Sequence, residues 1–213
     1  MNDTAIIVTS YCGGNHQEEK RKMTKTICKM LSEKGHYVIL TTHSPVDVDT
    51  QNYCDVFVYD KDNRFSFDGV PQRTTNHGVA ELTLMRNAVK LIPAEFKYLL
   101  KMAYDNKPDL DYHDIIRKCK ETGKKAVTAK WGNDITLGTQ MYFSEIEFFK
   151  QTLSMSELYR CDKDLEYVWY DSVKDKNLLD QVHVLDLYRN FFGHDVLQYA
   201  HAAGTLVDHY PYD

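Results

Sequence analysis

The sequence lacks the short motifs that mark several large enzyme classes. No GxGxxG follows a predicted strand, no GxxxxGK[ST] is present, and neither a GxSxG elbow nor an HExxH pair occurs. These absences argue against an ordinary Rossmann dehydrogenase, a P-loop enzyme, an α/β-hydrolase and a zincin. The Gly13-Gly14 pair alone is only a weak signal for a phosphate-binding loop.

The sequence also lacks a long apolar run, a net positive charge and closely spaced cysteine pairs. No apolar run approaches the roughly 20 residues that a bilayer span needs, and the N-terminus lacks the pattern of a signal sequence, so we expect a cytoplasmic protein with no membrane span. The net charge of −5 gives no electrostatic footprint for nucleic acid. The five cysteines form no CxxC pair, which suits reduced thiols better than a disulfide or zinc framework.

What is present is a regular alternation of strand-like and helix-like patterns in a chain of 213 residues, long enough for one sizeable core. Between the strand-like runs, apolar residues recur at helical spacing, as with Leu82, Met85, Val89 and Ile92. This order predicts a single α/β domain whose mainly parallel sheet is covered on both faces. The predicted strands are 5–9, 37–42, 55–59, 98–102, 126–130 and 141–143; further helices are predicted within 23–31, 112–122, 146–153, 156–172 and the last forty residues.

Polar residues follow the predicted strands where each strand ends. Asp105 comes just after the strand 98–102, and Thr9, Ser10 and Tyr11 stand where the first strand ends. In open α/β sheets, ligands bind beyond the carboxyl ends of the strands. We therefore expect the chemistry of this protein at that edge.

The order of these motifs resembles that of the GT-A type glycosyltransferases, in particular family-2-like members. The motifs are a first strand with a polar end, an N-x-G at Asn76 that opens a helix, an Arg-Asn pair at Arg86, and a strand that ends in Asp105. Further along, the segment 156–159 followed by Asp164-Leu165-Glu166 looks like the acceptor-side segment of this family. The resemblance covers roughly residues 5 to 175.

The resemblance implies a three-layer, Rossmann-like GT-A fold in one domain. Residues 1–106 would form the nucleotide-sugar half, 107–175 the acceptor-side half and 176–213 a helical C-terminal segment. The implied activity is a glycosyltransferase that moves a sugar from a nucleotide diphosphate sugar to an acceptor hydroxyl. The acceptor, whether a glycan, a protein or a modified nucleic acid, and the oligomeric state are left open.

Departure of a nucleotide diphosphate is assisted by a hard divalent cation such as Mn²⁺ or Mg²⁺. Asp105 is the candidate ligand, although the family's DxD motif is reduced here to one carboxylate. Asn106 can add a neutral oxygen, and by the resemblance a late histidine, His209 or His201, can complete the site.

A transfer with inversion at the sugar carbon needs a carboxylate that accepts the proton of the acceptor hydroxyl. Glu166 is the first choice for this general base and Asp164 the second. The residues expected around the donor are those at the strand ends together with a basic pair: Thr9, Ser10, Tyr11, His43, Ser44, Asp60, Arg86, Lys101 and Asp105. Lys101 can instead point into solvent.

Two other functions stay open. A nucleotidyltransferase that makes the activated sugar shares this fold, but it normally carries a glycine-rich, basic loop after the first strand, which residues 11–15 match poorly. A protein that kept the core and lost catalysis, acting in nucleotide binding or assembly, would fit the reduced acidic motif.

Overall fold

The structure, a computed structural model, contains seven strands in one sheet with helices packed on both faces. It describes residues 3–10, 12, 17–60, 77–104, 117, 120–129, 137–139, 141–153 and 165–185. The strands are β1 Thr4–Ser10, β2 Tyr37–Thr42, β3 Val56–Tyr59, β4 Tyr98–Ala103, β5 Ala126–Ala129, β6 Met141–Glu145 and β7 Val182–Leu185. The helices are α1 Gln17–Glu33, α2 Val48–Gln51, α3 His77–Val89, α5 Ile146–Thr152, α7 Leu165–Asp175 and a 3₁₀ turn, η1 Leu179–Gln181.

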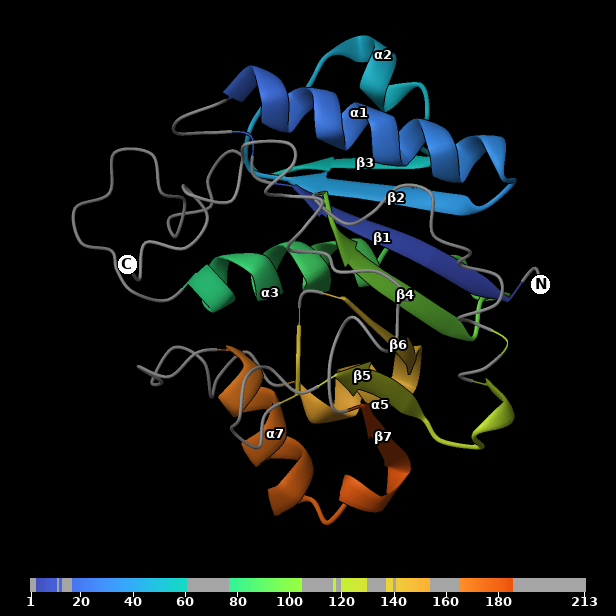
Figure 1. The fold of residues 1–213 in the computed structure, drawn as a ribbon, viewed down its shortest axis with the longest axis vertical. Coiled ribbons are helices and arrows are strands. Elements are labelled where there is room, and N and C mark those ends of the chain that lie inside the picture. The colour runs from blue at the N-terminus through green and yellow to red at the C-terminus, as the bar shows by residue number, and fades with distance from the viewer. Residues whose placement is uncertain are drawn as a thin grey trace.

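The sheet has the strand order β3-β2-β1-β4-β6-β5-β7, which Figure 1 shows from β3 near the top to β7 near the bottom. β1 pairs in parallel with β2 and β4, β2 with β3, and β5 with β7. β6 pairs antiparallel with both β4 and β5. Within this sheet β6 thus runs against all its companions, and the mainly parallel architecture expected from the sequence is confirmed.

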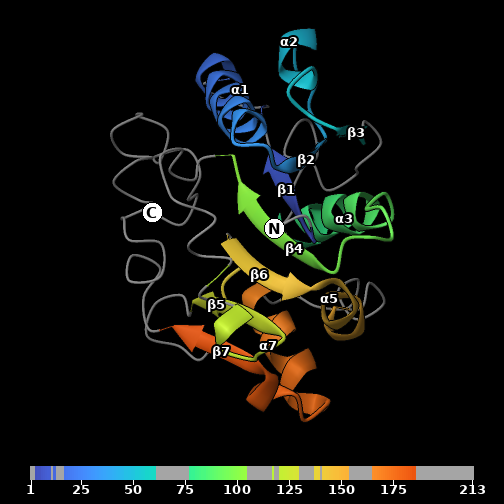
Figure 2. The same ribbon diagram turned by 90° about the vertical axis from the view of Figure 1, so that its right-hand side faces the viewer.

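Two apolar layers form because successive side chains of a strand point to opposite faces of the sheet. Ile6 and Val8 of β1 pack with α1, whereas Ile7 packs with α3, α5 and α7. The strands carry continuous apolar runs because both faces are covered, as is usual for parallel sheets. Figure 2 shows α3 and α5 on the same side of the sheet.

Helix α1 illustrates how the sequence sets an element and its end. Its inward face buries Met23, Ile27 and Leu31, which recur at steps of four. Gly35 ends the helix with a φ of +77°, a backbone conformation that residues with a Cβ rarely adopt. Its amide bonds to Ser32 O at 2.9 Å and the next amide bonds to Leu31 O, which is the Schellman pattern of helix ends.

The apolar face predicted for the central helix is confirmed, but two other expectations are corrected. Leu82, Met85 and Val89 of α3 lie in the core, whereas Ile92, predicted for the same helical face, lies beyond the end of the helix at Val89 and is partly buried against that core. The last forty residues were expected to be helical, yet 182–185 form strand β7, because their backbone pairs in parallel with β5. The segment 156–172, expected as two helical pieces broken near Cys161 and Asp162, is described only from residue 165, where α7 begins.

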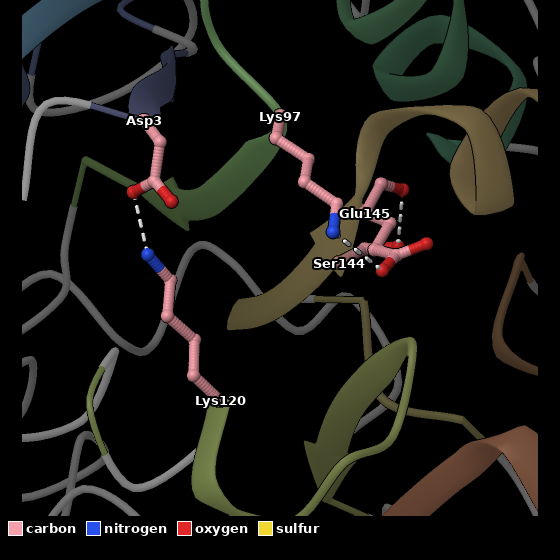
Figure 3. A network of polar contacts seen from close by, with 5 residues as sticks. All are labelled: Asp3, Lys97, Lys120, Ser144 and Glu145. Atoms are coloured by element: carbon pink, nitrogen blue, oxygen red, sulfur yellow. Dashed lines mark hydrogen bonds and ion pairs between the residues drawn. The ribbon is translucent and has the colours of Figure 1, made fainter.

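Charged residues connect several elements at the amino end of β4, opposite the edge where the parallel strands terminate. Asp3 accepts a hydrogen bond from Lys120 at 2.5 Å, and Lys97 forms an ion pair with Glu145 at 3.6 Å (Figure 3). Lys120 also lies over the ring of Tyr98, 4.5 Å from its centroid. These contacts link the beginnings of β1 and β4 to the end of β6.

The three cysteines in the described part of the chain are free thiols, in agreement with the prediction of reduced cysteines. Cys12, Cys28 and Cys54 form no disulfide. A hydrogen bond with Cys54 and burial in the core raise the pKa of Cys28 well above its usual value, which keeps this thiol protonated. In the described part of the chain, none of the helices is both long and apolar enough for a membrane crossing.

Candidate active site

The parallel strands β1, β2, β3 and β4 all terminate at one edge of the sheet, and the register places their ends side by side. Thr9 of β1 lies opposite Thr41 of β2 and Ala103 of β4. The amide of Tyr104, just beyond β4, donates to the carbonyl of Thr9 at 3.0 Å. The structure therefore brings the residues expected at successive strand ends to a common edge, the carboxyl edge of the sheet.

At the end of β2 the chain forms a tight polar turn. The hydroxyl of Thr42 donates to the carbonyl of Ser44 at 2.9 Å, and the amide of Ser44 donates to the same hydroxyl at 3.0 Å. The Ser44 hydroxyl is buried and has no hydrogen-bond partner within the described ranges. His43, between the two, is half-buried. A buried hydroxyl with unused hydrogen-bonding capacity is suited to bind a polar ligand group.

At the end of β1 the expected ligand Ser10 is bonded within the protein. Its hydroxyl lies 2.7 Å from the hydroxyl of Thr24 in α1 and 3.1 Å from the thiol of Cys12. Thr24 in turn donates to the carbonyl of Lys20 at 2.9 Å. This buried cluster joins the end of β1 to the first half of α1, so Ser10 faces α1, whereas Thr9 lies on the face of the sheet that carries α3.

The end of β3 is tied to both β2 and α3. The amide of Asp60 donates to the carbonyl of Thr42 at 2.9 Å, and its carboxylate accepts a hydrogen bond from Asn87 of α3 at 3.3 Å. Arg86, the neighbour of Asn87, is half-buried on the same helix. The Arg-Asn pair thus lies on the helix that contacts the ends of β2 and β3, and Asn87 orients the carboxylate of Asp60.

A second polar group lies on the α3 side of the sheet, under the carboxyl edge. Lys101 of β4 is 1% exposed and forms an ion pair with Glu81 of α3, which is 29% exposed. The ammonium also donates to the carbonyl of Thr139 at 2.7 Å. Lys101 therefore does not point into solvent, and its charge is compensated inside the protein.

The same threonine reaches the acid expected to act as general base. The hydroxyl of Thr139 donates to Oε1 of Glu166, in the first turn of α7, at 2.5 Å. Because β6 pairs antiparallel with β4, with Met141 opposite Met102, residues just before Met141 lie beyond the carboxyl end of β4. Glu166 and Lys101, predicted for opposite halves of the site, are thus connected through one residue at this edge, by its hydroxyl and its main-chain carbonyl.

The remaining predicted residues, Tyr11, Asp105, Asn106, Asp164 and His209, lie outside the described residues. Their roles stay predictions. In the ranges that the structure describes, no three His, Cys, Asp or Glu side chains are grouped so that they could hold a metal ion. The proposed metal ligands all belong to the part of the chain that is not described.

Sequence reasoning missed two residues of this arrangement. Glu81 lies four residues before Met85 on α3, so its helical spacing from the apolar face was a usable signal. Thr139 stands in the loop-like stretch 131–140, where nothing in the sequence distinguishes it from its polar neighbours. Only the folded chain shows that it contacts both β4 and α7.

Comparisons with known proteins agree with this architecture. The structure is similar to that of 4-diphosphocytidyl-2C-methyl-D-erythritol synthase from Anaerococcus prevotii, with a TM-score of 0.54 and 11% sequence identity, over 96% of each chain. It is also similar to a glycosyltransferase involved in glycosylation of the major capsid of PBCV-1, with a TM-score of 0.51 and 10% identity, over 95% of this chain and 99% of that one. The chain has a GT-A type fold.

At the level of sequence, no protein-family model and no curated protein matches this chain. The structural similarity extends over nearly the whole length of both neighbours, so the GT-A architecture accounts for the chain as one unit. The two neighbours differ in the reactions that their names describe, which is expected because one fold hosts several chemistries. The reaction has to be argued from the residues of the site.

Proposed function

We propose that this protein is a glycosyltransferase that moves a sugar from a nucleotide diphosphate sugar to an acceptor hydroxyl. The observation that carries the proposal is the contact between Thr139 and Glu166, which holds a carboxylate beside the end of β4. The GT-A fold supports the donor class, since the ends of β1 to β4 meet at the edge where such sheets bind ligands.

In this proposal Glu166 is the general base and takes the proton of the acceptor hydroxyl as the new glycosidic bond forms. A general base needs hydrogen-bond reach to its proton, so its carboxylate has to be oriented before the acceptor arrives. The carboxylate is half-buried and already accepts one hydrogen bond. Asp164, two residues earlier, is the second candidate.

The donor would be held by polar groups at the carboxyl edge. The buried hydroxyl of Ser44 and the carboxylate of Asp60 supply an acceptor and donor set suited to a base and ribose. Arg86 supplies a positive charge for the diphosphate. Asp105, Asn106 and His209 are proposed to hold Mn²⁺ or Mg²⁺, and such an ion would stabilise the negative charge of the departing nucleotide.

The first experiment measures melting of the purified protein with a panel of nucleoside diphosphates and nucleotide sugars, with and without Mn²⁺. A ligand present at 100 times its dissociation constant stabilises the native state by about 2.7 kcal/mol, which gives a clear shift. We expect a shift with one nucleotide sugar. The identified donor is then incubated with Mn²⁺ and a glycan acceptor panel, and release of nucleoside diphosphate is followed.

The variant Glu166→Gln keeps the shape of the side chain and removes the base. Loss of a general base typically lowers the rate by about 10²- to 10⁴-fold. We expect the donor-induced melting shift to persist in this variant while turnover falls in that range. The matched control is Glu147→Gln on α5, whose side chain is 82% exposed and pairs with Lys150 on the surface. Turnover by Glu166→Gln at the wild-type rate would refute the assignment of the base.

A nucleotidyltransferase is the second candidate, and buried Lys20 favours it. Lys20 lies in the first turn of α1, after the end of β1, and its side chain is 2% exposed. A lysine at this place is suited to bind phosphate as a point charge. Release of pyrophosphate from a nucleoside triphosphate and a sugar phosphate would support this reaction, and Lys20→Met would abolish it. Nucleotide binding without transfer under any metal would favour a binding role, and absence of any nucleotide effect would favour an assembly role.

A further inference from the structure

The three residues 137–139 each form hydrogen bonds to helices or strands of the fold. The amide of Leu137 donates to the carbonyl of Glu166 at 3.3 Å. The carbonyl of Gly138 accepts a hydrogen bond from the hydroxyl of Thr128 in β5 at 2.6 Å. The segment is therefore held by α7 on one side and by the sheet on the other.

Thr139 is bonded through both its main chain and its side chain. Its carbonyl accepts a hydrogen bond from the ammonium of Lys101, and that ammonium also forms an ion pair with Glu81. Its hydroxyl donates a hydrogen bond to Glu166. Thr139 itself is 3% exposed. A buried charge-assisted hydrogen bond on the carbonyl leaves the residue little freedom to move, so the direction of its hydroxyl is set by the sheet.

The rigid position of Thr139 restricts the movement of the Glu166 carboxylate. A glutamate has three side-chain torsions, and a half-exposed one loses rotamer freedom only if a partner holds it. Thr139 is a rigid partner of this carboxylate, because it is anchored to β4 and the β-branched threonine is stiff at χ1. The carboxylate is thus tied to β4, the strand whose carboxyl end adjoins the proposed donor site.

We propose that Thr139 is a positioning residue that orients Glu166 for proton abstraction, and that the buried Lys101–Glu81 pair holds Thr139 in place for this task. This inference rests on the proposed function for its catalytic part. Its structural part, the contribution of the Thr139 hydroxyl to the orientation of the carboxylate, is independent of which substrate is bound.

The test uses the full chain and a matched pair of variants. Thr139→Val keeps the branched shape and removes the hydroxyl, whereas Thr139→Ser keeps the hydroxyl and removes a methyl group. The first readout is the rate at which Glu166 is labelled by a water-soluble carbodiimide and an amine, followed by mass spectrometry of the peptide. The second is kcat and KM for the donor identified in the melting panel.

We expect Thr139→Val to be labelled several-fold faster at Glu166 and to lose at least tenfold in kcat, while KM for the donor stays within about twofold. Thr139→Ser should label like the wild-type protein and keep kcat within about threefold. A melting curve in the absence of ligand confirms that both variants are folded.

The proposal is overturned if Thr139→Val labels at the wild-type rate, or if Thr139→Ser loses as much kcat as Thr139→Val does. A wild-type protein without transferase turnover refutes the proposed function before any variant is made, and the catalytic part of the inference falls with it. Labelling then still decides whether Thr139 orients Glu166, so the two failures are distinguishable.

Discussion

The buried ion pair between Lys101 and Glu81 makes an asymmetric prediction about stability. Lys101 is 1% exposed, whereas Glu81 is 29% exposed. Removing the carboxylate with Glu81→Leu leaves the buried ammonium of Lys101 with the Thr139 carbonyl as a hydrogen-bond acceptor but without the opposite charge of Glu81. Loss of one partner from a buried pair costs about 3–5 kcal/mol, and we expect Glu81→Leu to lie in this range.

The opposite change is expected to be milder. Lys101→Met fills a similar volume with an apolar chain, and the partly exposed carboxylate of Glu81 can regain hydration. The main loss is the hydrogen bond to the carbonyl of Thr139, about 1–2 kcal/mol. In the double variant no charge is left buried, so it should be more stable than Glu81→Leu alone. Its destabilisation should be smaller than the sum of the single values by about 2 kcal/mol or more.

The assay is equilibrium denaturation in guanidinium chloride at pH 7, with the midpoint and slope fitted for the wild-type protein, both single variants and the double variant. The control is the surface pair Lys29–Glu33 in α1, at 3.8 Å with side chains 49% and 64% exposed. Substitution in that pair should change the free energy of unfolding by no more than about 0.5 kcal/mol. The reasoning is refuted if Lys101→Met costs as much as Glu81→Leu, or if the two costs add in the double variant.

Three further predictions concern stability elsewhere. Burial opposes the ionisation of Asp3, but the hydrogen bond and charge of Lys120 outweigh it and lower the pKa of this carboxyl. The resulting stability is present above the ordinary aspartate range and is lost as pH falls through the lowered pKa. The melting temperatures of the wild type and Lys120→Met should therefore converge as the pH falls below that range, and a constant difference in acid would contradict this. Trp169→Phe removes the buried hydrogen bond to Thr152, 3.0 Å long, and should cost about 1–3 kcal/mol in urea denaturation; an unchanged midpoint would contradict this. Gly35→Ala should cost about 1–2 kcal/mol by thermal melting, from backbone strain alone because no atom lies within 4 Å of the added Cβ, and a neutral result would show that the helix end can rearrange.

Most of the fold could be predicted from local patterns. The first strand, the second strand and the apolar face of α3 each carry a signal several residues long. The two strands lie within one residue of their predicted ends, whereas α3 ends at Val89, three residues before the last predicted position of its apolar face. The strand β7 could not be predicted in this way. Its four residues are too short for a clear period, and their strand character comes from pairing with β5, which the sequence does not reveal.

The candidate site could also be predicted only in part. Residues at strand ends could be named from the sequence, because the carboxyl ends of parallel strands meet at one edge wherever such a sheet forms. The orientation of each side chain could not. Ser10 bonds to Thr24 of α1, and Lys101 is buried against Glu81 of α3. In both cases the partner belongs to another element of the fold, so a local pattern in the sequence cannot predict where the side chain points.

The sequence by itself determined the alternation of strands and helices, the apolar residues that cover both faces of the sheet and the set of polar residues at the strand ends, because these depend on periodicity and on turn chemistry within short windows. Only the tertiary structure decided that β6 runs against its neighbours and thereby brings 137–139 to the end of β4. The contact from Lys101 through Thr139 to Glu166 follows from that pairing. Its physical reason is the sheet register, which joins residues far apart in the chain and leaves no trace in any local pattern.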